Sequence, residues 1–303
     1  MRGVFVDANG SLADIFERQR KSGDPAVRVN RNADIKSDDM PALLDGAEIV
    51  VIDHTALPTD IAKRCNGLKH VVFLGTGARS YMNPEELTEL GITVHLIKGY
   101  GDTAVAECAI ALMWAAARGI AKMDREMRAG NWLREDAMQL TGKTLGLIGF
   151  GGIAAEVARI ALGSGMKVIA WNRSLRQFSG VEFVSLDRLL AQSNIVSLHL
   201  LLNDETRGFL SHAHINAMKP GVILVNTARG AVVDEAAMIE ALKSGHIRHA
   251  GLDVFNIEPL PSDHPLTQIP NVTLSAHSAF RTPEASENLI HAAWEHSRRI
   301  ANG

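Results

Sequence analysis

The chain has 303 residues, with 31 basic against 34 acidic side chains and a formal net charge of −3. With 46% hydrophobic and 21% charged residues it has the composition of a globular protein, and no block of like charges predicts a nucleic-acid partner or an anionic membrane surface. Cys65 and Cys108 form no CxxC motif, so we expect free thiols and a cytoplasmic protein. The longest apolar run, residues 108–117, is shorter than the roughly 20 residues of a membrane-spanning helix.

Short β-branched runs alternate with helical patterns along almost the entire chain, which is typical of βαβ units and parallel sheets. In the first third we predict strands at residues 4–7, 27–29, 49–52, 71–74 and 93–96. A long helix from Thr103 to Arg128, capped by Asp102, comes next. Six more strands are predicted at residues 145–148, 168–171, 195–198, 222–225, 251–254 and 272–274, before a closing helix over 283–300. The fold class is therefore α/β, with two doubly wound parallel-sheet domains.

A glycine-rich turn joins the strand at 145–148 to a predicted helix over 155–162. The turn, Gly149 to Ala154, matches the pattern GxGxx(G/A) between a strand and a helix, as a dinucleotide site requires. Glycine turns also close strands in proteins that bind nothing, but this context favours the dinucleotide. Phosphates would bind the amides at the helix N-terminus. We therefore assign Gly149, Gly151, Gly152 and Ile153 to cofactor binding.

The residues after the next strand bear on the choice between NAD and NADP. In Rossmann domains an acidic residue about 20 positions after the turn binds the adenosine ribose and repels a 2′-phosphate. Here Asn172, Arg173 and Ser174 follow the strand, and the carboxylate is absent. An arginine can pair with the phosphate and a serine can donate to it, so we expect NADP to be preferred over NAD. If Arg173 points to solvent instead, dual or NAD preference remains open.

Several ordered motifs carry a family resemblance: Thr141 to Gly146, the glycine turn, Asn226 to Gly230 with Val233 to Glu235, Leu252 to Pro259, and His277. With them the chain resembles the D-isomer-specific 2-hydroxyacid dehydrogenase family, including its glyoxylate and hydroxypyruvate reductases. The resemblance implies a flavodoxin-like substrate domain, residues 1–98 with 282–303, and an inserted Rossmann nucleotide domain, residues 99–281. It also implies an active site in the cleft between them and a homodimer joined through the nucleotide domain.

Reduction of a 2-keto acid needs a hydride donor, a cation for the carboxylate and an acid for the carbonyl oxygen. Arg229 follows the strand at 222–225, at the carboxyl edge where such sheets bind ligands, and its guanidinium suits a carboxylate. His277 follows the last strand, and an imidazole can donate or accept a proton near neutral pH. Glu258, if it contacts His277, would fix its tautomer. Each residue alone also fits a solvated loop, and it is the resemblance that implies this catalytic set.

The resemblance also implies contacts to substrate and cofactor. The turn formed by Gly75, Thr76 and Gly77 ends a strand, and its amides would bind the substrate carboxylate. Tyr100 is similar to a substrate-facing position, and three further residues to positions that face the cofactor: Thr103, Ala228 and Asp253. No metal is expected, because His212 and His214 have no neighbouring residue that completes a zinc set.

We therefore expect a nicotinamide-dependent oxidoreductase that reduces a small 2-keto acid, such as glyoxylate, hydroxypyruvate or pyruvate, to its D-2-hydroxy acid. Gly152, Leu201 and Cys108 stand where the family often has arginine, proline and histidine, and none of these departures removes a catalytic group. One alternative is an NAD(P)-sensing binding protein without significant turnover. Another is a formate dehydrogenase of similar architecture. It is disfavoured because the resemblance implies a glutamine–histidine pair in the site of that enzyme, whereas this chain has Glu258.

Overall fold

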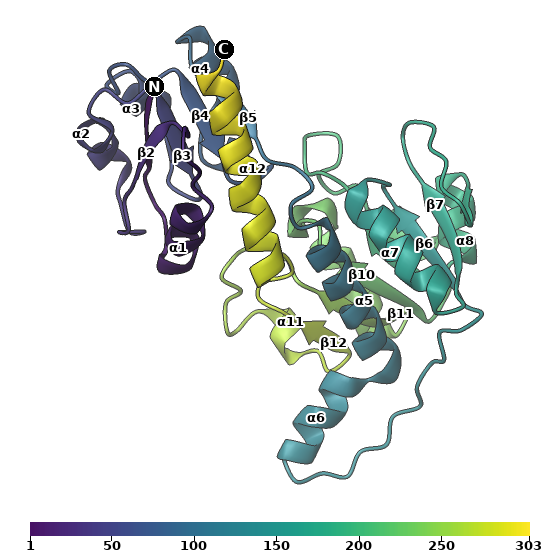
Figure 1. Ribbon diagram of the computed structural model, residues 1–303. Coiled ribbons are helices and arrows are strands. Elements are labelled where there is room, and N and C mark those ends of the chain that lie inside the picture. Colours follow the sequence, from purple (N-terminus) through teal and green to yellow (C-terminus); the bar gives the residue numbers. More distant parts are fainter. The chain divides into compact units, whose positions relative to one another are not determined.

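The computed structural model describes residues 1–303 and divides the chain into two compact units (Figure 1). Unit 1 comprises residues 1–101 and 282–303, and unit 2 comprises residues 102–281. The C-terminal helix α12 (Pro283–Ala301) belongs to unit 1, so this unit is discontinuous in sequence. Both units are built on parallel sheets, which confirms the predicted α/β class.

Unit 1 contains a five-stranded parallel sheet in the order β2-β1-β3-β4-β5. Its strands are β1 (Arg2–Phe5), β2 (Ala26–Val29), β3 (Ile49–Ile52), β4 (His70–Phe73) and β5 (Thr93–Leu96). Helices α1 (Gly10–Arg18) and α12 cover one face, and α2 (Met40–Leu44), α3 (Thr59–Ala62) and α4 (Pro84–Glu89) cover the other. This order is that of flavodoxin-like sheets, in which ligands bind at the carboxyl ends of the strands.

Unit 2 contains a seven-stranded parallel sheet in the order β12-β11-β10-β9-β6-β7-β8. Its strands are β6 (Thr144–Ile148), β7 (Lys167–Trp171), β8 (Val181–Phe183), β9 (Ile195–Leu198), β10 (Val222–Asn226), β11 (Ile247–Leu252) and β12 (Val272–Leu274). Helices α5 (Asp102–Arg118) and α7 (Gly152–Gly163) pack on one face, and α8 (Leu186–Gln192), α9 (His212–Asn216) and α10 (Glu235–Ser244) on the other. The short helix α11 (Pro265–Gln268) precedes β12.

Two predictions about these strands were wrong in detail. The sheet has seven strands rather than six, because β8 is a three-residue edge strand too short to show a pattern. The strand predicted at 251–254 spans residues 247–252, because the polar Arg248 and His249 lie inside it. His249 is buried and contacts Thr273 Oγ1 through Nε2 at 2.9 Å, and burial lowers its pKa to about 4. A neutral, hydrogen-bonded histidine is therefore tolerated in this strand.

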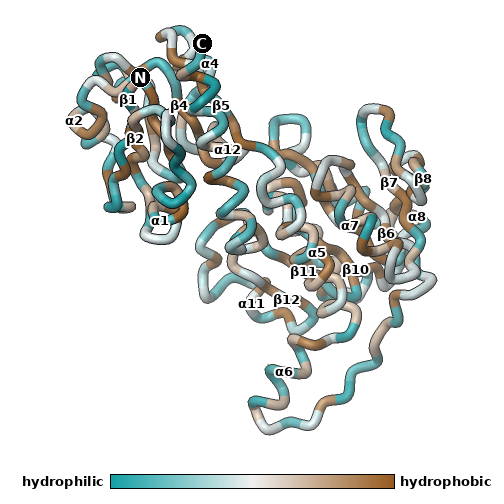
Figure 2. The backbone as a smooth tube through the Cα atoms, viewed as in Figure 1, coloured by the Kyte–Doolittle hydropathy of each residue, from teal (hydrophilic) through white to brown (hydrophobic).

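The predicted helix over 103–128 is two helices rather than one. Asp102 is the first residue of α5 rather than a cap before it, and α5 ends at Arg118. Gly119 then takes a left-handed conformation, φ 62°, before α6 (Ile120–Arg128) begins. Only glycine adopts that conformation without strain, so the break is local in origin. Hydrophilic residues predominate along α6 (Figure 2), and no single helix is long and apolar enough to cross a membrane, although α5 and α6 pass that test as a pair bent by 64°.

Candidate functional site

The glycine turn after β6 has the geometry that a bound dinucleotide needs. Gly149 has φ 87°, and a Cβ there would lie 2.6 Å from His199 O, so only glycine fits. A Cβ at Gly151 would meet nothing within 4 Å, which leaves the N-terminus of α7 open to an approaching group. Ala154 is buried in the core between α7 and the sheet. A strand, a tight turn and an accessible helix N-terminus together fit a pyrophosphate.

The segment after β7 is tied to this turn. Asn172 Oδ1 accepts a hydrogen bond from Phe150 N at 3.0 Å, and Asn172 Nδ2 donates to Ser174 O at 2.9 Å and to Ser174 Oγ at 3.0 Å. Arg173 forms an ion pair with Glu205, a residue that the sequence analysis did not single out. Both side chains of this pair are exposed, so the pair contributes little stability and Arg173 can exchange Glu205 for another anion.

Arg229 lies in a loop after β10 that the buried Asn226 holds in shape. Asn226 Oδ1 accepts from Ala228 N and its Nδ2 donates to Arg229 O, both at 3.0 Å. The exposed guanidinium of Arg229 donates to Ala228 O at 2.7 Å. Gly230 touches the loop after β11 so closely that a Cβ there would overlap the backbone of Phe255. The loops after two neighbouring strands are therefore held against each other.

Glu258 and His277, which are separated by 19 residues, contact each other directly. Glu258 Oε2 lies 2.6 Å from His277 Nδ1, and Glu258 Oε1 accepts a hydrogen bond from Phe255 N at 2.9 Å. Each side chain is 34% exposed. With Nδ1 facing the carboxylate, Nε2 is the ring nitrogen that remains for another molecule. The ring of Phe280 packs edge-on against the imidazole, with centroids 6.2 Å apart.

Asp253, directly after β11, anchors the loop that carries His277. Its buried carboxylate accepts hydrogen bonds from Ser275 Oγ at 2.5 Å, from Ser278 N at 3.1 Å and from Ala279 N at 3.0 Å. Its carbonyl oxygen accepts from the amide of His277 at 2.8 Å. His277 is one of two residues other than glycine with a positive φ, 47°, and these contacts hold it there. The carboxylate and the carbonyl oxygen of Asp253 thus position His277 by holding its loop in place.

Two half-buried groups of unit 2, Cys108 and His199, are kept neutral. Burial and the nearby Asp253 raise the pKa of Cys108 to about 11, so its thiol is protonated and unreactive at neutral pH. Burial lowers the pKa of His199 to about 4, and its Nε2 contacts Ser197 Oγ at 2.9 Å. No group of three or more histidine, cysteine, aspartate or glutamate side chains is arranged to hold a metal ion.

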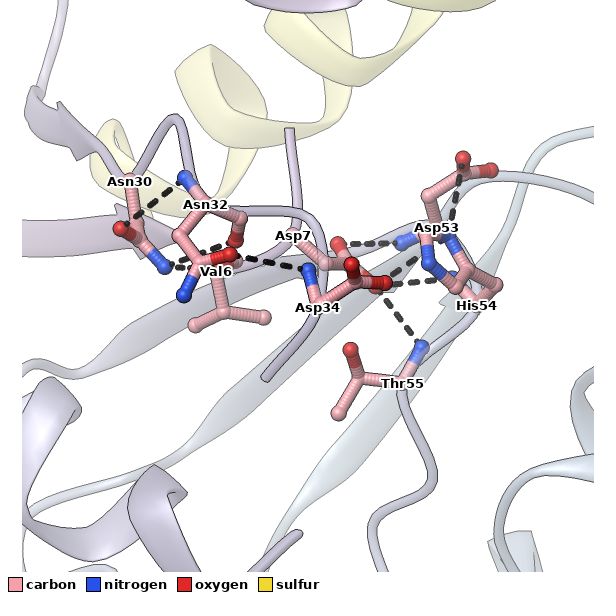
Figure 3. Close-up of polar contacts among 8 residues, drawn as sticks. All are labelled: Val6, Asp7, Asn30, Asn32, Asp34, Asp53, His54 and Thr55. Atoms are coloured by element: carbon pink, nitrogen blue, oxygen red, sulfur yellow. Dashed lines mark hydrogen bonds and ion pairs between the residues drawn. The ribbon is translucent and has the colours of Figure 1, made fainter. Parts of the chain in front are cut away.

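In unit 1, the predicted substrate turn, Gly75 to Gly77, follows β4 at the carboxyl edge of the sheet, and Gly75 has φ 151°. The neighbouring loop after β3 is organised by the buried carboxylate of Asp7, which accepts from the amides of Asp53, His54 and Thr55 at 2.7 to 2.9 Å (Figure 3). The sequence analysis missed Asp7, because its role depends on a contact across 46 to 48 residues. Tyr100, also in unit 1, accepts a hydrogen bond at its carbonyl oxygen from Asn288, whereas Thr103 lies in α5 of unit 2.

Comparison with known proteins identifies the family of the chain. Residues 110–279 match the family model described as "D-isomer specific 2-hydroxyacid dehydrogenase, NAD binding domain". A hydroxypyruvate reductase of Thermotoga maritima is 37% identical over 84% of this chain and 85% of its own, and a glyoxylate reductase of Aeropyrum pernix is 39% identical over 76% of this chain and 75% of its own. A solved acyclic imino acid reductase, in complex with NADPH and D-Arg, superimposes with a TM-score of 0.86 at 29% identity and covers 100% of this chain and 98% of its own. The chain therefore belongs to the D-isomer-specific 2-hydroxyacid dehydrogenase family and is a nicotinamide-dependent oxidoreductase that transfers a hydride between its cofactor and a 2-keto or 2-hydroxy acid.

Proposed function

We propose that this protein reduces glyoxylate, hydroxypyruvate or a similarly small 2-keto acid to the D-2-hydroxy acid, with NADPH as the preferred cofactor. The observation that carries the proposal is the 2.6 Å contact between Glu258 and His277 beside the Arg229 loop. Relatives named hydroxypyruvate reductase and glyoxylate reductase support the substrate class. An acid–base pair and a loop that carries an arginine match what the reduction of a keto acid demands of its site.

The catalytic roles follow from the chemistry of each side chain. Arg229 binds the substrate carboxylate through two parallel hydrogen bonds, after its side chain leaves Ala228 O. His277 donates the proton on Nε2 to the carbonyl oxygen while the bound nicotinamide supplies the hydride. Glu258 holds His277 in the tautomer and orientation that the transfer needs and stabilises the charged imidazole. In the oxidative direction His277 accepts the proton instead.

The remaining assignments concern binding. The turn of unit 1, Gly75, Thr76 and Gly77, contributes amides for the substrate carboxylate, and Tyr100 faces the substrate. The cofactor's pyrophosphate binds at Gly149 to Ile153, and Thr103 and Ala228 contribute to the nicotinamide end. The buried Asp253, whose carboxylate is occupied by the loop of His277, supports that end through this loop. Domain boundaries near residues 98 and 282 would then separate substrate binding from nucleotide binding.

A preference for NADP is supported by the absence of an acidic residue after β7. Asn172 is held by Phe150 and Ser174, and its neutral amide does not repel a 2′-phosphate on the adenosine ribose. Arg173 is exposed and bound only to an equally exposed Glu205, which a 2′-phosphate would displace. The solved relative that contains NADPH adds support, since it is similar over the entire chain.

We also propose a homodimer joined through unit 2. Helix α6 and the segment after it expose Ile120, Met127 and Trp132, with Trp132 75% exposed. Exposed large apolar side chains in one stretch of the chain favour a partner, and a second copy of this chain is the simplest one. Both cysteines are free, which fits the reducing cytoplasm.

The direct test is a panel of 2-keto acids assayed with NADPH and NADH, with loss of the reduced nicotinamide as the readout. We expect glyoxylate and hydroxypyruvate to give the highest kcat/KM. Arg229→Gln is the matched variant, because it keeps a hydrogen-bonding side chain but loses the positive charge. It should raise KM and lower kcat for every acid. A pure sample that oxidises neither cofactor with any of these acids would refute the proposal.

A further inference from the structure

Asp102 places a carboxylate at the phosphate end of the nucleotide site. Asp102 is the first residue of α5 and Gly152 is the first residue of α7. The two helices pack side by side on one face of the sheet (Figure 1). A Cβ built on Gly152 would overlap Asp102 Oδ2, so the carboxylate occupies the space that any side chain at residue 152 would need. The absence of a side chain at Gly152 is what admits Asp102.

The charged groups near Asp102 do not neutralise it. Burial, and then Glu156 on the next turn of α7, raise the pKa of Asp102. The other elements that contact α5 offer no cation to it. Strands β10 and β12 contain no charged residue, Arg248 of β11 donates to Asp136 O, and Lys122 of α6 pairs with Glu135. Asp253, after β11, faces Cys108 further along α5. In α7, Arg159 pairs with Glu156, so Asp102 has a negative neighbour and no basic partner.

The N-terminus of α7, where Gly152 lies, is the binding site expected for the cofactor's pyrophosphate. The open space at Gly151 and the dipole of α7 favour an anion there. An ionised Asp102 and a pyrophosphate would then be two like charges only a few ångströms apart in a partly buried place, where their repulsion is weakly screened. Gly152 has no side chain and so supplies no compensating positive charge.

We propose that Asp102 sets the affinity of this protein for its dinucleotide, because its ionised carboxylate opposes the pyrophosphate and binding is coupled to uptake of a proton by Asp102. The inference rests on the proposed function in one respect, that the cofactor's phosphates bind at the N-terminus of α7. The proton comes from solvent and forms an O–H bond on the carboxylate. Affinity therefore rises as the pH falls through the titration of Asp102, and it becomes constant at higher pH, where the carboxylate is ionised in the free protein and in the complex.

The test is calorimetric titration of NADH into the protein at about pH 5 and about pH 8, in pairs of buffers with different ionisation enthalpies. NADH is the probe because it lacks the 2′-phosphate of NADPH, whose own titration would obscure the proton count. The wild type should take up a proton and bind more tightly at the lower pH. Asp102→Asn should bind about tenfold more tightly than the wild type at the higher pH, which is the order expected of one nearby charge, and should take up no proton.

Two further variants complete the test. Glu156→Gln should keep the proton uptake and move it to lower pH, because one of the two causes that raise the pKa of Asp102 is removed. Asp187→Asn, in the first turn of α8, is the matched control and should bind NADH as the wild type does. If Asp102→Asn binds within about twofold of the wild type and still takes up the proton, the inference is overturned. If the wild type binds neither NADH nor NADPH, the proposed function fails, and this inference fails with it.

Discussion

Replacing Asp253 by asparagine should destabilise unit 2 by about 2 to 3 kcal/mol, because hydrogen bonds to a charged acceptor contribute about 1.5 to 3 kcal/mol each. The carboxylate accepts from Ser275 Oγ and Ser278 N on one oxygen and from Ala279 N on the other. An asparagine of the same shape keeps one oxygen and turns an NH₂ group toward a donor. One hydrogen bond is lost, and the other two are then made to a neutral acceptor. The asparagine also avoids the cost of burying a charge, and this gain limits the total loss of stability.

Scanning calorimetry measures this loss, because unit 2 is large enough that each kcal/mol lowers Tm by about 2 to 4 °C. The transition of unit 2 should move down by about 4 to 12 °C in Asp253→Asn. Ser275→Ala is the matched control, since it removes a single donor to the same carboxylate and should cost about 1.5 kcal/mol, the lower end of the range for one such hydrogen bond. A loss in Asp253→Asn no larger than in Ser275→Ala would show that the carboxylate does not anchor the loop of His277.

Three other predictions concern catalysis, cofactor choice and assembly. His277→Ala should lower kcat by about 10² to 10⁴ and leave the Kd for the dinucleotide unchanged, and near-normal turnover would exclude His277 as the acid. Arg173→Ala should lower kcat/KM for NADPH and leave the value for NADH nearly unchanged, whereas Glu205→Gln should raise the NADPH value by freeing Arg173. If the wild-type kcat/KM for NADPH is equal to or lower than the value for NADH, the preference for NADP is contradicted. Light scattering should give twice the monomer mass of 32.7 kDa, and Trp132→Ser should move it toward the monomer; a wild-type mass near 32.7 kDa would count against the dimer.

The fold was largely predictable because its central strands are buried on both faces. Every residue of the strands at Ile49–Ile52 and Ile195–Leu198 is buried, and the predicted bounds of both strands match the structure. Prediction failed where local sequence conflicts with the environment. Strand β8 is too short to form a pattern, and the polar start of β11 is made tolerable by a hydrogen bond from another strand. The break at Gly119 divides a segment that reads as one helix.

The sequence by itself determined the α/β class, the glycine turn and the missing acidic residue after β7, because each depends on residues close together in the chain. Only the tertiary structure decided which distant groups meet. Glu258 contacts His277, Asp253 anchors the loop of His277 from a different strand, and Asp102 lies against Gly152, 50 positions away. Such contacts arise when parallel strands bring their carboxyl ends to one edge of a sheet and when helices pack on one face, and no local pattern encodes the atoms that then touch.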